Sequence, residues 1–511
     1  MAGIKALAKE TAIYGVSSIL GRFLNWCLVP LYVYLFDPEE YGIVSYLYSF
    51  TAVALVILNY GMETGFFRYA SRHEEPDTVY TTSLISVGTT SIIFIVLLSI
   101  FLNPIADGMR LHGFGFYVLL LGIIVAIDAF TNIPFAYLRY QRKAIRFAII
   151  KFINIGSNIA FNLFFLLLCP KLQQSCPWTI SWFYEPLGGQ AFGIGWIFVA
   201  NLLSTLLVMI MLLPQIMGCP YRFDGSLLRK ILSYSWPLLI LGVAGIMSQN
   251  MGQIIIPYLF DNQDEARAMV GIYGANIKIA IVMVMFTQAF RYAYEPFIFA
   301  RDKEKNADGS NSSSKAYCDA MKFFVILGLF IFLAVMFFMP LIKHFVSQKY
   351  WPGLNVVPIM MAAELCMGVA FNLSLWYKLT DRTQWGMYLS VGTFIIMLAL
   401  NIVFVPLIGA PNGYMGSAWA ALIAYFIMMF ASWMLGRRYY PLPYEWGAMG
   451  AYLILAAVLW GIGEWLFAFP GHKWLMYLTR SCLLIFYLFM IARFEHLPLP
   501  GRLGALTAKR Q

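Results

Sequence analysis

The chain has 511 residues, of which 61% are hydrophobic and only 12% are charged, and its mean hydropathy is +0.72. Ordinary soluble domains carry about 25% charged residues, so this composition excludes a water-soluble globular protein. The formal net charge is +10. Attraction to anionic lipid headgroups accounts for this charge, so membrane lipids are expected partners and nucleic acid is not.

Helix-length apolar stretches follow one another along the chain, with most charges in the short gaps between them. Barrel strands would instead alternate in segments of about ten residues, so we expect an all-α polytopic membrane protein. The first stretch contains Gly15, Arg22 and Pro30 and no small-residue cleavage site, so a retained span is expected and not a signal peptide. A span needs roughly 20 apolar residues, and about fourteen such stretches are predicted as spans. They lie near residues 11–36, 41–67, 81–103, 113–138, 145–169, 191–213, 231–258, 268–293, 320–342, 353–377, 384–408, 413–436, 447–469 and 474–492.

The Lys and Arg residues of the gaps are distributed unequally between the two sides of the membrane. Most of them, including Arg139 and Lys322, fall on the side of the N-terminus. The opposite gaps carry only Arg110, Lys171, Arg267, Lys343, Lys349 and Lys473. Because positive charge is retained inside, both termini are predicted to be cytoplasmic.

Three sequence matches suggest an internal repeat. Leu35-Phe36-Asp37 closes the first span and Phe67-Arg68-Tyr69 follows it, while Leu259-Phe260-Asp261 closes the seventh span and Phe290-Arg291-Tyr292 follows at nearly the same distance. A self-similarity of this length is the signature of a repeated architecture.

The other two matches keep the same order. One sets Tyr137, Arg139, Arg142 and the later Asn162 against Tyr377, Lys378, Arg382 and Asn401, and the other sets Gly193, Gly195 and Trp196 against Gly413, Gly416 and Trp419. Copies separated by an even number of spans have the same orientation, which predicts two parallel six-helix lobes around a central cavity that opens alternately. The predicted parts are an N-lobe over 1–220, a C-lobe over 221–440, and an appended helix pair with a cytoplasmic tail over 441–511.

Ionisable residues within the spans are the candidate site residues. An ionised group at mid-membrane costs about 2.5 to 3.5 kcal/mol, so it implies a partner or a wet cavity. Arg22, Asp128, Lys278 and Glu364 lie near mid-membrane by their depth in the spans. The two cations could bind a diphosphate, and the two carboxylates could hold the cations, accept sugar hydroxyls or carry a proton. Structural neutralisation of the four charges is the alternative.

Further residues extend this hypothesis. Lys151 and Arg291 lie nearer the inner mouth, where they could bind an anionic headgroup or simply extend to the interface. Glu63 is predicted to be a surface charge. Polar and aromatic side chains could bind sugars or could instead join helices; they include Asn154, Asn158, Asn162, Trp26, Tyr60, Tyr273 and Trp376. The cysteines show no metal-ligand spacing, and only Cys169 and Cys176 could form a disulfide on the outer face.

The opening Tyr14-Gly15-Val16-Ser17-Ser18-Ile19-Leu20-Gly21-Arg22, the following Pro38-Glu39-Glu40-Tyr41-Gly42 and the basic turn Leu138-Arg139-Tyr140-Gln141-Arg142 carry a resemblance. The chain resembles the polysaccharide transporter branch of the multidrug, oligosaccharidyl-lipid and polysaccharide (MOP) exporter superfamily, above all the O-antigen and lipid-linked oligosaccharide flippases. Arg22 matches the first-helix cation often seen in these flippases, and Lys278 and Arg291 lie in a span where such relatives also carry basic residues.

This resemblance implies two six-helix lobes, a cationic cavity and a location in the inner membrane of a bacterial cell. It also implies passage of an undecaprenyl-diphosphate-linked glycan to the periplasmic leaflet for polysaccharide or lipopolysaccharide synthesis. It also implies coupling to a proton or sodium gradient and, as further partners, polysaccharide-assembly proteins. No P-loop is present in the sequence, and neither a cofactor, a metal nor enzymatic activity is expected.

Three alternatives remain open. A cation-coupled multidrug exporter would favour carboxylates in the first and seventh spans, where the chain has Arg22 and the uncharged Gln249, Asn250 and Gln253. A membrane enzyme of glycan assembly would need paired carboxylates or a His constellation on an aqueous loop, but the 171–190 gap offers only Glu185. A lipid II flippase is the third.

Overall fold

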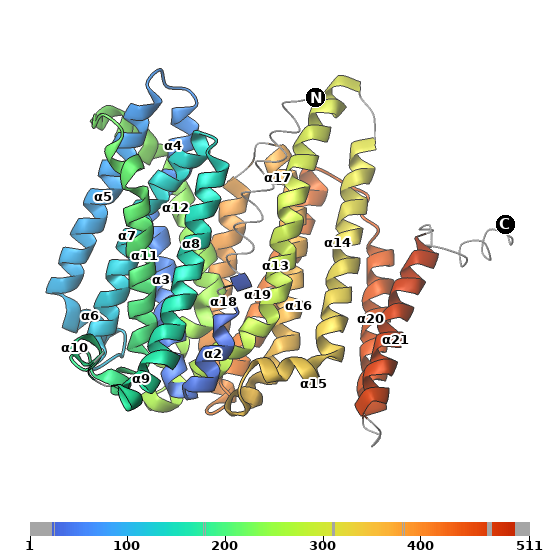
Figure 1. Ribbon diagram of the computed structural model, residues 1–511. Helices are drawn as coiled ribbons and strands as arrows, with labels where there is room; N and C mark the ends of the chain where they lie inside the picture. The colour runs from blue at the N-terminus through green and yellow to red at the C-terminus, as the bar shows by residue number, and fades with distance from the viewer. Residues whose placement is uncertain are drawn as a thin grey trace. The chain divides into compact units, whose positions relative to one another are not determined.

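The computed structural model describes residues 23–24, 26–176, 178, 180–308, 312–380, 382, 384–467 and 473–495. Every regular element in these ranges is a helix (Figure 1). This confirms the predicted all-α fold. The physical reason is that a helix satisfies its backbone hydrogen bonds internally, which the hydrocarbon core requires because it supplies no water.

Thirteen helical segments of the described residues are long and apolar enough to cross a membrane. They correspond in order to the second through the fourteenth predicted spans. Their bounds are Pro38–Ala70, Pro76–Ile100, Gly115–Tyr140, Ala144–Ser175, Gly195–Met217, Gly225–Leu259, Gln263–Arg291, Lys315–Phe337, Gln348–Leu379, Gln384–Ile408, Tyr414–Tyr439, Trp446–Leu466 and Trp474–Phe494. Most of the first predicted span, with Arg22, lies outside the described residues, and its last part forms α2 (Leu28–Leu35).

The chain divides into two compact units. Unit 1 comprises Met1–Lys278, Lys349–Gly353 and Thr383–Ala424, and unit 2 comprises Ile279–Gln348, Leu354–Arg382 and Tyr425–Gln511. The long helices α13 (Gln263–Asp308) and α19 (Tyr414–Tyr439) therefore each contribute to both units. These units are defined by contacts within the fold. The boundaries predicted at residues 220 and 440 are defined by the sequence repeat, so they stay a prediction.

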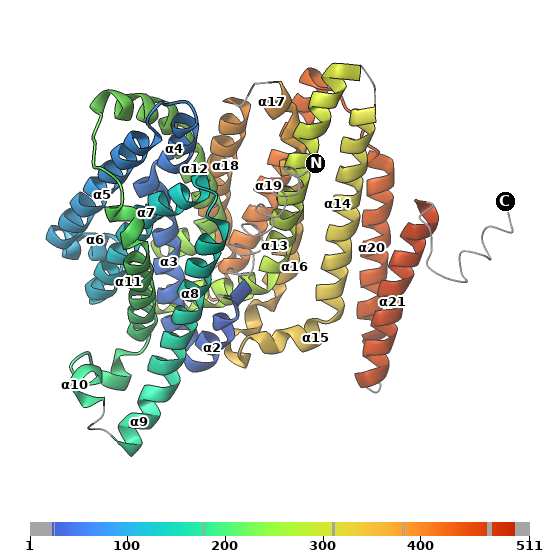
Figure 2. The same ribbon diagram turned by 45° about the horizontal axis from the view of Figure 1, so that its top comes forward.

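Unit 1 is built on helices that pack along much of their length. In Figures 1 and 2, α7 lies beside both α5 and α11, and these pairs are in contact. Helix α12 packs against α3 and α18. The core contains Met62, Phe66, Tyr80, Ile133 and Leu212, all fully buried. The helices of this unit are α2, α3 (Pro38–Asn59), α4 (Met62–Ala70), α5 (Pro76–Ile100), α6 (Leu102–Gly108), α7 (Gly115–Tyr140), α8 (Ala144–Leu163), η1 (Phe164–Leu168), α9 (Cys169–Ser175), α10 (Ser181–Tyr184), η3 (Gly189–Phe192), α11 (Gly195–Met217), α12 (Gly225–Leu259) and α18 (Gln384–Ile408).

Unit 2 surrounds a second core in which Phe324, Phe337 and Tyr487 are fully buried. Helix α14 packs against α16, α20 and α21, and the red helices α20 and α21 lie side by side in Figure 1. The buried Arg480 forms an ion pair with Glu464, also in this pair, and donates a hydrogen bond to the carbonyl oxygen of Phe337 at 2.7 Å. The other helices of unit 2 are α14 (Ser312–Phe337), α15 (Met339–Ile342), η4 (Lys343–Phe345), α16 (Val356–Leu373), α17 (Leu375–Leu379), α20 (Trp446–Phe467) and α21 (Lys473–Phe494), and η5 (Gln348–Asn355) spans a boundary.

The matched sequence segments have similar local geometry in two of three cases. Helices α2 and α12 both end at the matched Leu, and the next residues, Phe36 and Phe260, are both extended. The basic turns close with equivalent hydrogen bonds, from the amide of Lys143 to the oxygen of Leu138 and from the amide of Arg382 to the oxygen of Tyr377. The third match diverges, because Trp196 is buried and Trp419 is exposed.

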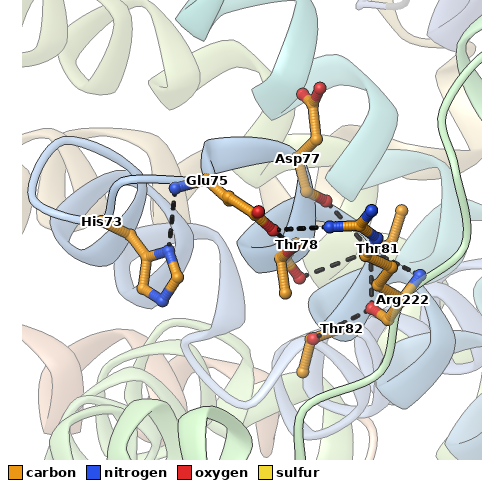
Figure 3. Close-up of polar contacts among 7 residues, drawn as sticks. All are labelled: His73, Glu75, Asp77, Thr78, Thr81, Thr82 and Arg222. Carbon is orange, nitrogen blue, oxygen red and sulfur yellow. Dashed lines mark hydrogen bonds and ion pairs between the residues drawn. The ribbon is translucent and has the colours of Figure 1, made fainter.

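A polar junction joins the start of α5 to the segment before α12 (Figure 3). An Nη atom of Arg222 lies 2.9 Å from a carboxylate oxygen of Glu75, and the Thr78 hydroxyl donates to the same oxygen. The Thr81 hydroxyl donates to the carbonyl oxygen of Arg222 at 2.8 Å, and the amide of Asp224 donates to the Thr82 hydroxyl. These bonds fix the chain where it enters α12, whose first turn is capped by the Asp224 carboxylate.

The junction makes stability depend on pH. The Thr78 hydroxyl and then the Arg222 guanidinium hold the pKa of Glu75 below its ordinary value of 4.5. A carboxyl whose pKa is lower in the folded state stabilises the fold above the unfolded pKa, and this contribution is lost as pH falls through the folded pKa. We therefore expect wild type to have a higher Tm than Glu75→Gln at neutral pH, with the difference vanishing in acid below 4.5. The neighbouring Glu74→Gln should leave Tm unchanged, because Glu74 forms no hydrogen bond or ion pair with any described residue.

Candidate functional site

Four charged side chains of unit 1 form one interacting group. Asp128 and Arg139 lie on α7, Lys151 lies on α8 and Glu63 lies on α4. Lys151 is close enough to the other three for their charges to interact with its own, and its ammonium lies 4.0 Å from the centre of the Phe135 ring. We call these four residues the N-lobe charge group. The structure thus brings together two of the predicted site residues, Asp128 and Lys151.

Glu63 and Arg139 were missed as site residues by the sequence analysis. They form an ion pair in which the Glu63 side chain is 40% exposed, so Glu63 lies at the surface as predicted and also has a partner that the sequence did not indicate. The Arg139 guanidinium also lies 5.1 Å from the centre of the Phe67 ring, and its Nε is buried without a hydrogen-bond partner among the described residues. Depth within a span gave no signal for this pair, because both residues are near helix ends and only the packing of α4 on α7 joins them.

Polar side chains continue from Asp128 across the neighbouring helices. The Thr205 hydroxyl on α11 donates to the Asp128 carboxylate at 3.4 Å. One turn away, the Asn132 amide donates to the Asn59 side-chain oxygen on α3. Such bonds are the usual means by which polar groups within a membrane bundle are satisfied. Asp128 is therefore held in place by α11 as well as attracted to Lys151.

Lys278 is separate from the N-lobe charge group. It is half-buried on α13, and its ammonium forms no hydrogen bond or ion pair with any described residue. The indole nitrogen of Trp26 donates to the main-chain oxygen of Lys278 at 2.6 Å, so the first predicted span meets α13 at this level. The Trp26 side chain thus contacts the main chain of the residue whose ammonium has no counter-ion in the described structure.

The remaining predicted site residues belong to unit 2. The guanidinium of Arg291 lies 4.5 Å and the ammonium of Lys378 lies 4.4 Å from the centre of the same Phe371 ring. Glu364 is half-buried on α16 and forms no hydrogen bond or ion pair with any described residue. Lys378 corresponds to Arg139 in the internal match, so each half places a basic residue from this turn on an aromatic ring.

The structure also contains a cavity of about 250 Å³ in unit 1, between α3, α5, α6 and α7. Its lining is apolar and includes Phe50, Phe94 and Val118. None of its lining residues is charged and Thr51 is the only hydroxyl-bearing residue among them, so the lining offers no cation to a diphosphate. Within the described ranges, no group of three or more His, Cys, Asp or Glu side chains is placed to hold a metal ion.

Comparison with known proteins identifies the family. Residues 7–299, which are more than half of the chain, match the family model described as polysaccharide biosynthesis protein. The chain belongs to this polysaccharide biosynthesis family. The assignment agrees with the resemblance carried by the opening and the basic turn. No curated protein matches the chain significantly.

Solved structures share the fold of this polysaccharide biosynthesis family member at low sequence identity. The lipid II flippase MurJ in an inward closed conformation is 14% identical, with a TM-score of 0.70 over 96% of this chain and 99% of its own. An inward-facing multidrug resistance MATE family transporter of the MOP superfamily is also 14% identical, with a TM-score of 0.63 over 82% and 94% of the two chains. An outward-facing member of the same family has a TM-score of 0.56 at 15% identity, over 85% and 95%. The fold is therefore that of the MOP exporters.

Several polar and aromatic side chains of this family member have structural roles where sugar contacts were one hypothesis. Asn162 is fully buried and accepts a hydrogen bond from the Tyr32 hydroxyl at 3.0 Å. Its partner in the repeat, Asn401, is also fully buried and accepts one from the Ser417 hydroxyl at 2.7 Å. Tyr273 and Trp376 are buried, so neither ring face is open to a sugar. Cys169 is buried and Cys176 is exposed, and no disulfide joins these two described residues.

Proposed function

We propose that the protein is a flippase that moves an undecaprenyl-diphosphate-linked oligosaccharide, such as an O-antigen repeat unit, from the cytoplasmic to the periplasmic leaflet of a bacterial inner membrane. One observation carries the proposal most directly. Lys278 lies in an apolar helix of a polysaccharide biosynthesis family member, and its ammonium has no counter-ion among the described residues. An uncompensated charge in a span is costly, which supports a role in binding an anion.

The substrate chemistry fits the cations of the chain. A diphosphate has several acceptor oxygens and more than one negative charge, so it can use point-charge ammonium groups and the paired donors of a guanidinium. Lys278 and Arg22 would bind the diphosphate. Lys151 and Arg291 would attract it from the cytoplasmic side.

We propose that Asp128 and Glu364 couple the conformational change to a proton or sodium gradient. Asp128 interacts with Lys151, so a change in its charge would alter the cation's affinity for an anion. Glu364 lies in an apolar helix and forms no hydrogen bond or ion pair with any described residue, so a bound proton or sodium ion would neutralise a costly charge there. Alternating access of two lobes would then carry the diphosphate across, with both termini cytoplasmic.

The test uses proteoliposomes that contain a labelled undecaprenyl-diphosphate oligosaccharide, with and without an imposed pH or sodium gradient. It measures how much of the glycan the protein exposes on the side that corresponds to the periplasm. We expect exposure with wild type, and a loss of roughly tenfold or more in Arg22→Ala and Lys278→Ala, as for removal of a charge-assisted hydrogen bond. Lys230→Ala is the matched control, because Lys230 is exposed near the start of α12. Efflux of cationic dyes with no glycan exposure under any gradient would instead identify a multidrug exporter.

A further inference from the structure

Unit 2 contains a cavity of about 630 Å³ that the proposed function does not use. It lies among α14, α20 and α21, near the start of α20 and the end of α21. One part of its lining is polar and consists of Lys322, Glu445, Tyr452 and Glu495. The rest is apolar: Ala448, Ala451, Ile454, Leu455, Val458, Met490 and Phe494. The cavity thus has an ionic end and a hydrocarbon wall.

The ionic end is a cluster of charged side chains joined by hydrogen bonds. The Lys322 ammonium lies 3.0 Å from a carboxylate oxygen of Glu445 and 2.7 Å from one of Glu495. The Tyr452 hydroxyl donates to the other oxygen of Glu495. The side chains of Lys322 and Glu495 are only 9% and 14% exposed, whereas that of Glu445 is 52% exposed. The inner pair is therefore fixed, and the carboxylate of Glu445 is the accessible group.

Charge decides what this end can bind. Two carboxylates and one ammonium leave a net negative charge, so the cluster attracts a cation and repels an anion that brings no cation of its own. An isoprenoid diphosphate is excluded on this ground. The accessible Glu445 can accept hydrogen bonds from a primary ammonium, and Lys322, which has three N–H donors, has one left after its two carboxylate partners. That donor suits a phosphodiester held beside the ammonium.

The apolar wall indicates that the bound headgroup carries hydrocarbon chains. Ala451, Ile454, Val458 and Phe494 are exposed although they lie on helices apolar enough to span a membrane. In the bilayer such a surface faces acyl chains. The Lys322 cluster lies at the helix ends that the charge distribution predicts to be cytoplasmic. At this depth a lipid has its headgroup and not its acyl chains.

We propose that this cavity is a binding site for a membrane phospholipid with a primary ammonium headgroup. The ammonium binds Glu445, the phosphodiester accepts from Lys322, and the acyl chains lie along the apolar side of α20 and α21. This inference goes beyond the proposed function and does not depend on it.

Native mass spectrometry of the full-length protein tests the site, with phosphatidylethanolamine, phosphatidylcholine and phosphatidylglycerol of matched chains added separately. We expect phosphatidylethanolamine to bind roughly tenfold more tightly than phosphatidylglycerol, since its ammonium forms ionic hydrogen bonds. The quaternary ammonium of phosphatidylcholine has no N–H donor and should bind between the two. Glu445→Gln should abolish the preference. Glu464→Gln is the matched control, because it makes the same change near the far end of α20, outside the cavity lining, and the new amide oxygen can still accept a hydrogen bond from Arg480.

A second variant leaves the charges in place. Ala451→Trp puts a large side chain into the exposed cavity wall and should reduce bound phosphatidylethanolamine, while an unchanged Tm shows that the fold is intact. Equal or tighter binding of phosphatidylglycerol by wild type would overturn the proposal. The proposal would also be overturned if the preference for phosphatidylethanolamine survived Glu445→Gln, or if Glu464→Gln removed it to the same extent.

Discussion

Replacement of Lys278 by Met is expected to raise the thermal stability of the protein while it reduces glycan transport at least about tenfold. The two effects have one cause. The Lys278 ammonium is half-buried in an apolar helix and forms no ion pair with any described residue. Removal of an uncompensated charge from mid-membrane relieves a cost of up to about 3 kcal/mol, and Met keeps most of the apolar stem.

The local structure should survive this substitution. Trp26 donates to the main-chain oxygen of Lys278, and the side-chain change leaves that bond in place. The measurements are Tm in detergent and the proteoliposome exposure assay, at matched protein levels. Lys230→Met, at an exposed site on α12, should change neither. A Tm that falls together with transport would show that Lys278 is a structural ion-pair partner and would contradict its role in anion binding.

Gly271→Val is expected to destabilise the protein strongly, by about 3 kcal/mol or more, because it places a bulky side chain against main-chain atoms. A Cβ at Gly271 would lie 1.9 Å from the carbonyl oxygen of Pro38, and a Cβ at Gly42 would lie 1.9 Å from that of Arg267. Helices α3 and α13 therefore meet backbone to backbone at this pair of glycines. Close approach of this kind is what small residues allow in membrane bundles.

The size of the effect can be graded and controlled. Gly271→Ala already introduces the clashing Cβ, so it should lower Tm in the same direction as Gly271→Val. Gly245→Ala on α12 is the matched control, since a Cβ there meets nothing within 4 Å. It should be neutral or stabilising by up to about 1 kcal/mol, the ordinary gain of Ala over Gly in a helix. Equal Tm values for the Gly271 and Gly245 variants would contradict the close contact.

The sequence alone predicted the membrane architecture well. Thirteen predicted spans have matching helices in the described structure, because each span is determined by its own apolar residues and by the need to satisfy its backbone internally. The family could also be inferred from local motifs, such as the opening of the first span. The mid-membrane depth of Asp128, Lys278 and Glu364 was predicted by counting residues along a helix, and it stays a prediction.

The tertiary structure alone decided which charges have partners. Glu63 and Arg139 are far apart in sequence and meet only because α4 packs on α7, while Lys322, Glu445 and Glu495 meet where α14, α20 and α21 come together. The close pair Gly42 and Gly271 is equally invisible in the sequence, since glycine can serve a turn, a bend or a contact. Hydrophobicity is a property of each segment, whereas an ion pair or a helix crossing is a property of two segments. The spans could therefore be predicted one at a time, and their partners could not.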